Sequence, residues 1–203
     1  MRAIALFLAG LVASASHAQV APSPSEKASY RGLLAAAAKG DAGEIRRLVA
    51  KGAQPDVRDG YRRTPLHVAA YGGRHEAMRA LVAAGANPNA LERDRYDVAT
   101  IAAVANDVPT LKVALELGCS AKNITSRYDG TALIAAAHLG WTALMESIVL
   151  GDGGARHTET LNALVAAGAN ANMADRNGQT PLTLARRRGY AEMVKILERA
   201  GAR

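Results

Sequence analysis

Side chains that commonly carry catalysis or bind metals are present in this sequence, but their spacing does not bring them together. Four of the five histidines lie beyond residue 18: His67, His75, His138 and His157. No two of them have the i, i+4 spacing of a helical zinc site, and the chain has no pair of cysteines. No serine stands in a Gly-x-Ser-x-Gly elbow, and the carboxylates are scattered. We therefore predict no catalytic residue, no metal site and no cofactor.

A glycine-rich segment at residues 151–157, Gly-Asp-Gly-Gly-Ala-Arg-His, is the strongest candidate for a small-ligand site. Glycine-rich loops can wrap phosphate, but this one lacks the Gly-Lys-Ser/Thr ending of a phosphate-binding loop and follows no predicted strand. A surface loop is the simpler interpretation, although inserted loops often carry binding specificity. An alternative hypothesis of a ligand-binding or enzymatic protein therefore depends on Asp152 and His157.

The elements that position these side chains are predicted from a recurring helix pattern. Thr64 is placed to cap a helix that begins at Pro65 and continues through Leu66 and His67, and Gly73 supplies a left-handed residue at its end. The same nine-residue interval recurs at Thr131–Gly140, at Thr142–Gly151, at Thr180–Gly189 with Pro181 and Leu182, and at Asp97–Asn106 with substitute residues at both ends.

A second marker gives the period of the recurrence. Gly52, Gly85 and Gly118 are 33 residues apart, as are Gly168 and Gly201. Each is followed by alanine, except that Cys119 follows Gly118. A fixed period of this length predicts stacked supersecondary units. We expect Cys119 to be a buried, inert replacement for a small residue, and a reactive thiol or an intermolecular disulfide is the alternative.

These residues resemble the ankyrin repeat, whose pattern Thr-Pro-Leu-His-x-Ala-Ala-x-x-Gly … Gly-Ala-x-x-Asn is met almost fully at 64–89 and well at 168–189. The resemblance covers roughly residues 28–203. It implies an all-α solenoid of helix-turn-helix repeats joined by hairpin-like loops, in which His67 hydrogen-bonds between adjacent loops. It also implies a non-enzymatic protein-protein interaction module, although a fold does not fix a function.

The chain is predicted to divide into a signal peptide, a short lead and one repeat domain. An apolar run follows Arg2, and small residues stand at Ser16 and Ala18, which is typical of a secretory signal cleaved before Gln19. We therefore expect a periplasmic or secreted protein with no later membrane anchor. The predicted segments are 1–18 (signal), 19–27 (flexible lead) and 28–203, with repeats at about 28–59, 60–92, 93–126, an irregular 127–173, and 174–203.

The irregular unit breaks the period. Thr131 and Thr142 are 11 residues apart where 33 are expected, so we predict the loss of about 22 residues at the junction of Gly140 and Trp141. Helices are predicted at about 131–139, 142–150 and 158–167, with the middle one in a second-helix place that its apolar pattern does not suit. A non-functional product of this deletion, with a low and broad melting transition, is a third hypothesis.

The net charge of +7 is spread over many repeats, which favours an acidic protein surface over nucleic acid as the partner. Three successive loop tips carry a tyrosine beside arginines, and these two residue types are enriched at binding hot spots. The alternative is that the tips are solvated and each tyrosine leans on the next loop. We predict a monomer that binds its partner through Tyr61, Arg62, Arg63, Arg95, Tyr96, Arg127 and Tyr128.

Overall fold

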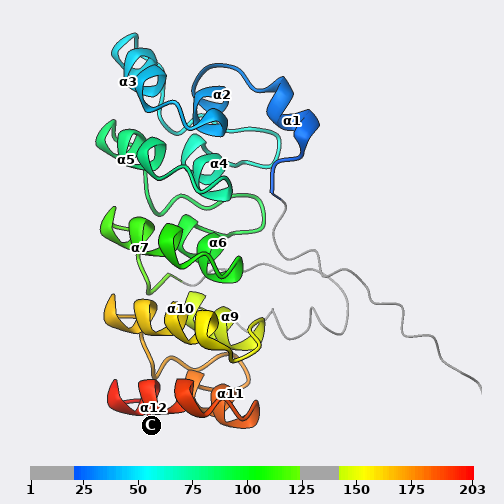
Figure 1. Ribbon diagram of the computed structural model, residues 1–203, viewed down its shortest axis with the longest axis vertical. Coiled ribbons are helices and arrows are strands. Elements are labelled where there is room, and N and C mark those ends of the chain that lie inside the picture. The colour runs from blue at the N-terminus through cyan, green and yellow to red at the C-terminus, as the bar shows by residue number, and fades with distance from the viewer. Residues whose placement is uncertain (1–20, 124–141) are drawn as a thin grey trace, which may run out of the picture.

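The computed structural model describes residues 21–123 and 142–203, and within these ranges the chain folds into helix pairs stacked along one axis (Figure 1). Each helix packs against its pair mate and against the equivalent helices of neighbouring pairs. This is the all-α solenoid that the repeat pattern predicts. The first helices are α2 (Gly32–Lys39), α4 (Pro65–Tyr71), α6 (Val98–Val104), α9 (Ala143–Val149) and α11 (Pro181–Arg187), and the second helices are α3 (Ala42–Ala50), α5 (His75–Ala83), α7 (Val108–Glu116), α10 (Ala155–Ala166) and α12 (Ala191–Arg199).

The first helices begin and end where their sequence predicts. The Thr64 side chain accepts a hydrogen bond from the backbone N–H of His67, and Pro65 occupies the first turn. Asp97 caps α6 by accepting from the N–H of Thr100 at 2.8 Å. Asn106 takes the left-handed conformation after this helix, with φ 52°. The substitute residues of the third repeat therefore do the predicted jobs.

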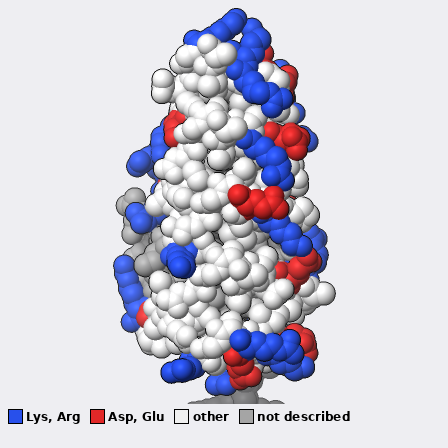
Figure 2. All heavy atoms as spheres, turned by 90° about the vertical axis from the view of Figure 1, so that its left-hand side faces the viewer, with Lys and Arg blue, Asp and Glu red and all other residues white. Residues whose placement is uncertain are grey.

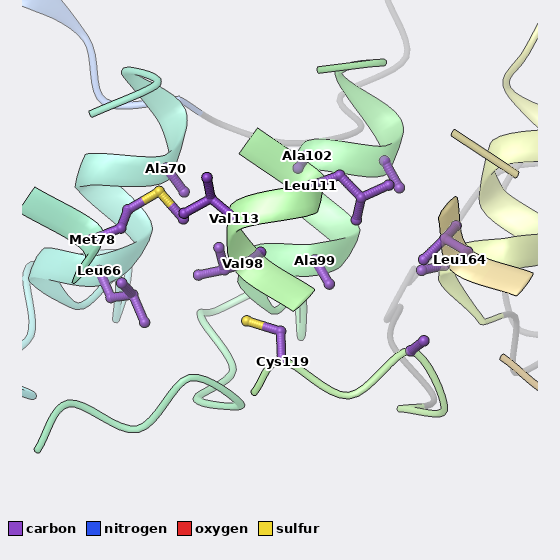
Figure 3. Close-up of a cluster of buried hydrophobic side chains, with 14 of the residues drawn as sticks. Leu66, Ala70, Met78, Val98, Ala99, Ala102, Leu111, Val113, Cys119 and Leu164 are labelled. Carbon is purple, nitrogen blue, oxygen red and sulfur yellow. The ribbon is translucent and has the colours of Figure 1, made fainter. Parts of the chain in front are cut away.

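Small residues let the first helices approach one another closely. Ala69, Ala99 and Ala185 are completely or almost completely buried in α4, α6 and α11. Larger side chains such as Met78 and Leu111 fill the space between the two rows, as the close-up of one cluster shows (Figure 3). The core is therefore continuous from repeat to repeat rather than divided into separate units.

The helix at 143–149 does not lie where we predicted. α9 packs between α6 and α11, and α10 packs between α7 and α12, so α9 fills a first-helix place. Our prediction of a second-helix place was wrong, because the apolar pattern of this segment decides its row. Leu144, Met145 and Ile148 are all fully buried there, so the packing defect that we expected is not found in this helix.

Several predictions for the irregular unit fall beyond the described ranges. The helix predicted at 131–139, with Thr131 and Gly140, lies outside the described residues, as does the junction of Gly140 and Trp141. The loss of about 22 residues at that junction stays a prediction. α10 begins at Ala155, three residues before the predicted start at 158, because it extends back toward the glycine-rich segment.

The lead before the first repeat is partly helical, which corrects the flexible segment predicted over 19–27. Helix α1 (Pro24–Ser29) begins with a capping box, in which Ser23 accepts from the N–H of Glu26 at 3.2 Å and donates its own N–H to the Glu26 carboxylate at 2.8 Å. Glu26 also forms an ion pair with Arg63. The lead is therefore attached to the first hairpin loop. A bilayer-spanning helix, which would have to be long and apolar, is not found among the described residues.

Candidate binding surface

Three hairpin loops share one turn built around a carboxylate. In each, the N–H of the first residue donates to the carbonyl of the fifth, and the N–H of the fourth donates back to the carbonyl of the first, at 2.9–3.1 Å. The side chain of the first residue, Asp59, Glu92 or Asp175, accepts from the N–H groups of the third and fifth residues. The loops are residues 59–63, 92–96 and 175–179, and we call the surface formed by their tips the hairpin edge.

His67 joins two successive repeats behind this edge. The N–H of Thr64 donates to His67 Nδ1 at 3.1 Å, and His67 Nε2 lies 3.2 Å from the carbonyl oxygen of Tyr96 in the next loop. Because Nδ1 accepts, Nε2 carries the proton and donates to that carbonyl. The ring is completely buried, and this burial lowers the pKa of His67 to about 4.

The loops also bind one another directly. The N–H of Arg93 donates to the carbonyl of Tyr61 at 2.9 Å, which links the tips of the second and third repeats. The Arg58 guanidinium donates to the carbonyls of Arg62 and Leu91, each at 2.8 Å. These three contacts hold the first two tips in a fixed relative position.

Charges on the hairpin edge are arranged unlike those of the second-helix side. The carboxylates of Asp59 and Glu92 point into their turns, whereas Arg62 and Arg95 are exposed and have no ion pair among the described residues. On the second-helix side basic and acidic side chains lie next to one another (Figure 2). They form ion pairs between repeats, namely Arg79–Glu116 at 3.1 Å and Lys112–Glu159 at 2.9 Å. The unpaired positive charge therefore lies at the hairpin edge.

Comparison with known proteins assigns this architecture to a family. A family model described as ankyrin repeats (3 copies) matches residues 99–203, which is more than half of the chain, and a second model, ankyrin repeats (many copies), matches residues 33–82. The chain belongs to the ankyrin repeat family. The Escherichia coli (strain K12) protein YahD, which is named as an ankyrin repeat protein, is 46% identical over 65 residues. That match covers 32% of this chain and 32% of YahD, so it spans about a third of the relative's length.

Ankyrin repeats indicate a protein-protein interaction module, and the structure separates the predicted binding residues into two groups. Arg62 and Arg95 are exposed at the tips, as a binding role requires. Arg63 and Tyr96 are completely buried, so our prediction that they contact a partner was wrong. Both occupy the fifth position of their ankyrin turn, where the side chain points inward. Arg127 and Tyr128 lie outside the described residues.

Tyr61 follows the alternative that we left open for the tyrosines. Its ring is half-buried, with the Arg63 guanidinium 4.6 Å and the Arg93 guanidinium 5.8 Å from its centroid. Tyr61 therefore leans on the next ankyrin loop through Arg93. Arg93 is itself an exposed residue of the hairpin edge that our sequence reasoning missed. The position that it shares with Gly60, second in the turn, could have identified it.

The glycine-rich loop at 151–157 is held by contacts to both neighbouring ankyrin repeats. The hydroxyl of Tyr190 donates to the carbonyl of Gly151 at 2.7 Å. From the other side, Arg156 donates to the carbonyl of Asn106 at 3.0 Å, and Thr160 donates to its side-chain oxygen at 2.8 Å. Gly153, rather than Gly151, takes the left-handed conformation, with φ 74°.

The two chemical groups of this loop are engaged in the loop itself. His157 Nδ1 lies 2.8 Å from an Asp152 oxygen, which also accepts from the N–H of Gly154 at 2.8 Å. These two bonds lower the pKa of Asp152, the larger effect coming from Gly154. The loop therefore serves as a connection between repeats, and this geometry gives the ligand-binding alternative no support. Within the described residues, no three His, Cys, Asp or Glu side chains lie close enough to hold a metal ion.

Replacing Gly153 by alanine is expected to reduce the free energy of unfolding by about 2 kcal/mol. A Cβ at this position would lie 2.4 Å from a ring carbon of Tyr190, and the hydrogen bond from Tyr190 to Gly151 keeps the ring from moving away. Gly178→Ala is the matched control, because Gly178 has the same φ of 74° and nothing within 4 Å of its Cβ position. That control should lose only about 1 kcal/mol in urea unfolding. Equal losses would show that the contact with Tyr190 is unimportant.

Cys119 is buried, as predicted for a replacement of the ankyrin alanine. Its thiol donates to the carbonyl of Pro88 at 3.1 Å. Burial raises the pKa of the thiol to about 12, so the reactive thiolate is scarce at neutral pH. These observations favour the inert interpretation over a reactive thiol.

Proposed function

We propose that this ankyrin protein is a non-enzymatic binding module that attaches to an acidic surface of another protein through its hairpin edge. We further propose that it works in the periplasm or outside the cell, after removal of residues 1–18. The observation that carries the first proposal is the charge arrangement at the tips: the carboxylates of the turns face inward and the arginines face outward.

Three features of the edge support this role. Exposed arginines without an internal ion pair keep their full capacity for bidentate bonds to carboxylates. The hydrogen bonds between the tips fix them in place, so little conformational entropy is lost on binding. A surface of one charge also attracts an acidic partner from a distance, an effect that weakens as salt is added.

The test is an affinity capture from a periplasmic extract of the source bacterium, using residues 19–203 as bait. A charge-reversed bait, Arg62→Glu/Arg95→Glu, should lose the captured protein, and capture by the native bait should decline with salt. Arg46→Glu/Arg199→Glu is the matched control, because it changes the net charge equally at exposed residues of α3 and α12. Equal capture by the native and Arg62→Glu/Arg95→Glu baits would contradict the proposed edge. Equal loss with both variants would show nonspecific attraction to positive charge.

The proposed location has its own test. The support for it is the sequence of residues 1–18, where a short apolar run follows a single positive charge and precedes small residues. We expect the protein in the periplasmic or secreted fraction, with Gln19 at its N-terminus by Edman sequencing or mass spectrometry. A cytoplasmic protein that retains residues 1–18 would overturn this proposal.

A further inference from the structure

The fourth position of the carboxylate-centred turn has an unusual occupant in two of the three described loops. Arg62 has φ 59° and Arg95 has φ 66°, whereas the equivalent residue of the last repeat is Gly178, with φ 74°. L-amino acids other than asparagine and aspartate rarely adopt this left-handed conformation, because Cβ approaches the backbone too closely. Among the described residues other than glycine, only Asn106 shares a positive φ, and asparagine tolerates it.

Nothing inside the protein requires an arginine at these two positions. The turn hydrogen bonds of the three loops are the same, so glycine satisfies the backbone equally well. The neighbouring arginines do have internal tasks: Arg58 donates to two carbonyls, Arg63 pairs with carboxylates and Arg93 stacks over Tyr61. No side-chain contact of this kind is described for the guanidinium of Arg62 or of Arg95. A strained residue that contributes nothing internally is a sign of a functional position.

The two arginines are also fixed relative to each other. They stand at the same position of consecutive repeats, 33 residues apart, and the bonds from Arg93 to Tyr61 and from Arg58 to Leu91 connect their loops. Stacked helices are about 8–10 Å apart, which sets the spacing of equivalent positions in neighbouring repeats. The acidic residues of both turns, Asp59 and Glu92, are committed to backbone N–H groups, and Asp94 between them is half-buried.

We propose that Arg62 and Arg95 form a two-point clamp for two carboxylates of an extended acidic segment in the partner protein. This inference rests on the proposed function, because it specifies what the hairpin edge recognises. A polyproline-type segment advances about 3.1 Å per residue and turns once every three residues, so side chains three positions apart lie on one side about 9 Å apart. That distance matches one repeat. The preferred segment therefore carries a Glu or Asp at every third position, each carboxylate taking a bidentate bond from one guanidinium.

The test measures stability and binding on the same variants. The probes are two fluorescein-labelled peptides of one composition, with Glu either at every third position or in a single block. Native protein should bind the spaced peptide about tenfold more tightly than the blocked one by fluorescence anisotropy at low salt. Arg62→Gly/Arg95→Gly should lose at least tenfold in affinity for the spaced peptide, while its Tm rises by about 2–4 °C because the strain is relieved. Arg62→Lys/Arg95→Lys should keep the native Tm and lose part of the affinity.

Each other result overturns the clamp in a recognisable way. Unchanged affinity of the glycine variant would show that the two arginines do not hold the peptide. Equal affinities for the two peptides would reject the two-point spacing, and capture of a partner in the preceding experiment would then still support an acidic-surface function. A lower Tm of the glycine variant would remove the strain argument. If neither peptide binds while capture succeeds, the partner is recognised by another chemistry.

Discussion

Replacing Arg63 by methionine is expected to lower the free energy of unfolding by about 3–5 kcal/mol. The Arg63 side chain is completely buried and pairs with two carboxylates, one of Asp59 at 2.7 Å and one of Glu26. Methionine fills a similar volume but leaves the Asp59 charge buried without its cation. The loss is large against the roughly 5–15 kcal/mol that stabilises a typical domain.

The surrounding contacts show why this pair matters to the fold. The hydroxyl of Tyr30 donates to Asp59 at 2.6 Å, so α1, its following residue and the first hairpin loop meet at one carboxylate. Burial alone would raise the pKa of Asp59, but the hydrogen bonds from Tyr30 and Arg63 outweigh it and the net pKa lies below its ordinary value. Asp59 therefore stays ionised at neutral pH and depends on Arg63.

Urea unfolding followed by circular dichroism measures the effect, with Arg62→Met as the matched control. Arg62 is adjacent in sequence but exposed, so its replacement should change the free energy of unfolding by less than about 0.5 kcal/mol. Amide hydrogen exchange supplies a second readout, because α1 should lose protection when Glu26 loses its partner. A loss below about 1 kcal/mol for Arg63→Met, with α1 still protected, would contradict the assigned role.

The same network explains one limit of the sequence analysis. Arg62 and Arg63 are neighbours of the same type, and composition and spacing treat them alike. The turn separates them: its fourth residue points outward and its fifth points into the protein. Tyr96 is buried for the same reason, at the fifth position of its own loop. Hot-spot statistics could not make this distinction, because it depends on a contact with Glu26 some 37 residues away.

Features set by local backbone chemistry were predictable from the sequence. The left-handed Asn106, the cap at Asp97 and the buried Cys119 each follow from what one residue type can do at one place in the period. The place of α9 was not predictable from counting residues, since it depends on which row its apolar side chains can enter. Likewise, the helical lead is stabilised by tertiary contacts of Glu26 and Tyr30 rather than by its own composition.

Acidification is expected to destabilise the protein through His67, by about 3 kcal/mol between pH 6.5 and pH 4. The pKa of the folded residue is about 4, below its ordinary value of 6.5, because burial disfavours the charged ring. In this window the unfolded chain binds a proton that the folded chain does not, so stability falls as the pH falls. The contribution is constant above about pH 6.5 and falls no further below about pH 4.

The hydrogen bonds of His67 give this shift a structural cause. Nδ1 accepts from the N–H of Thr64, and a proton on Nδ1 would place two donors against each other. Protonation would therefore weaken the helix cap of α4 as well as bury a charge. The contact from Nε2 to the carbonyl of Tyr96 can persist, so the damage should begin in the second repeat rather than between the loops.

The measurement compares native protein with His67→Asn in urea at about pH 7 and about pH 4. The variant should be less stable at neutral pH, but its stability should depend less on pH, by about 3 kcal/mol over this interval. Carboxylates with lowered pKa values, such as Asp59 and Glu26, titrate in both proteins and cancel in the comparison. The imidazole resonance of His67 should also remain that of a neutral ring at pH 5.5 in NMR spectra. A titration midpoint near 6.5 would show that the ring is not held as the structure describes.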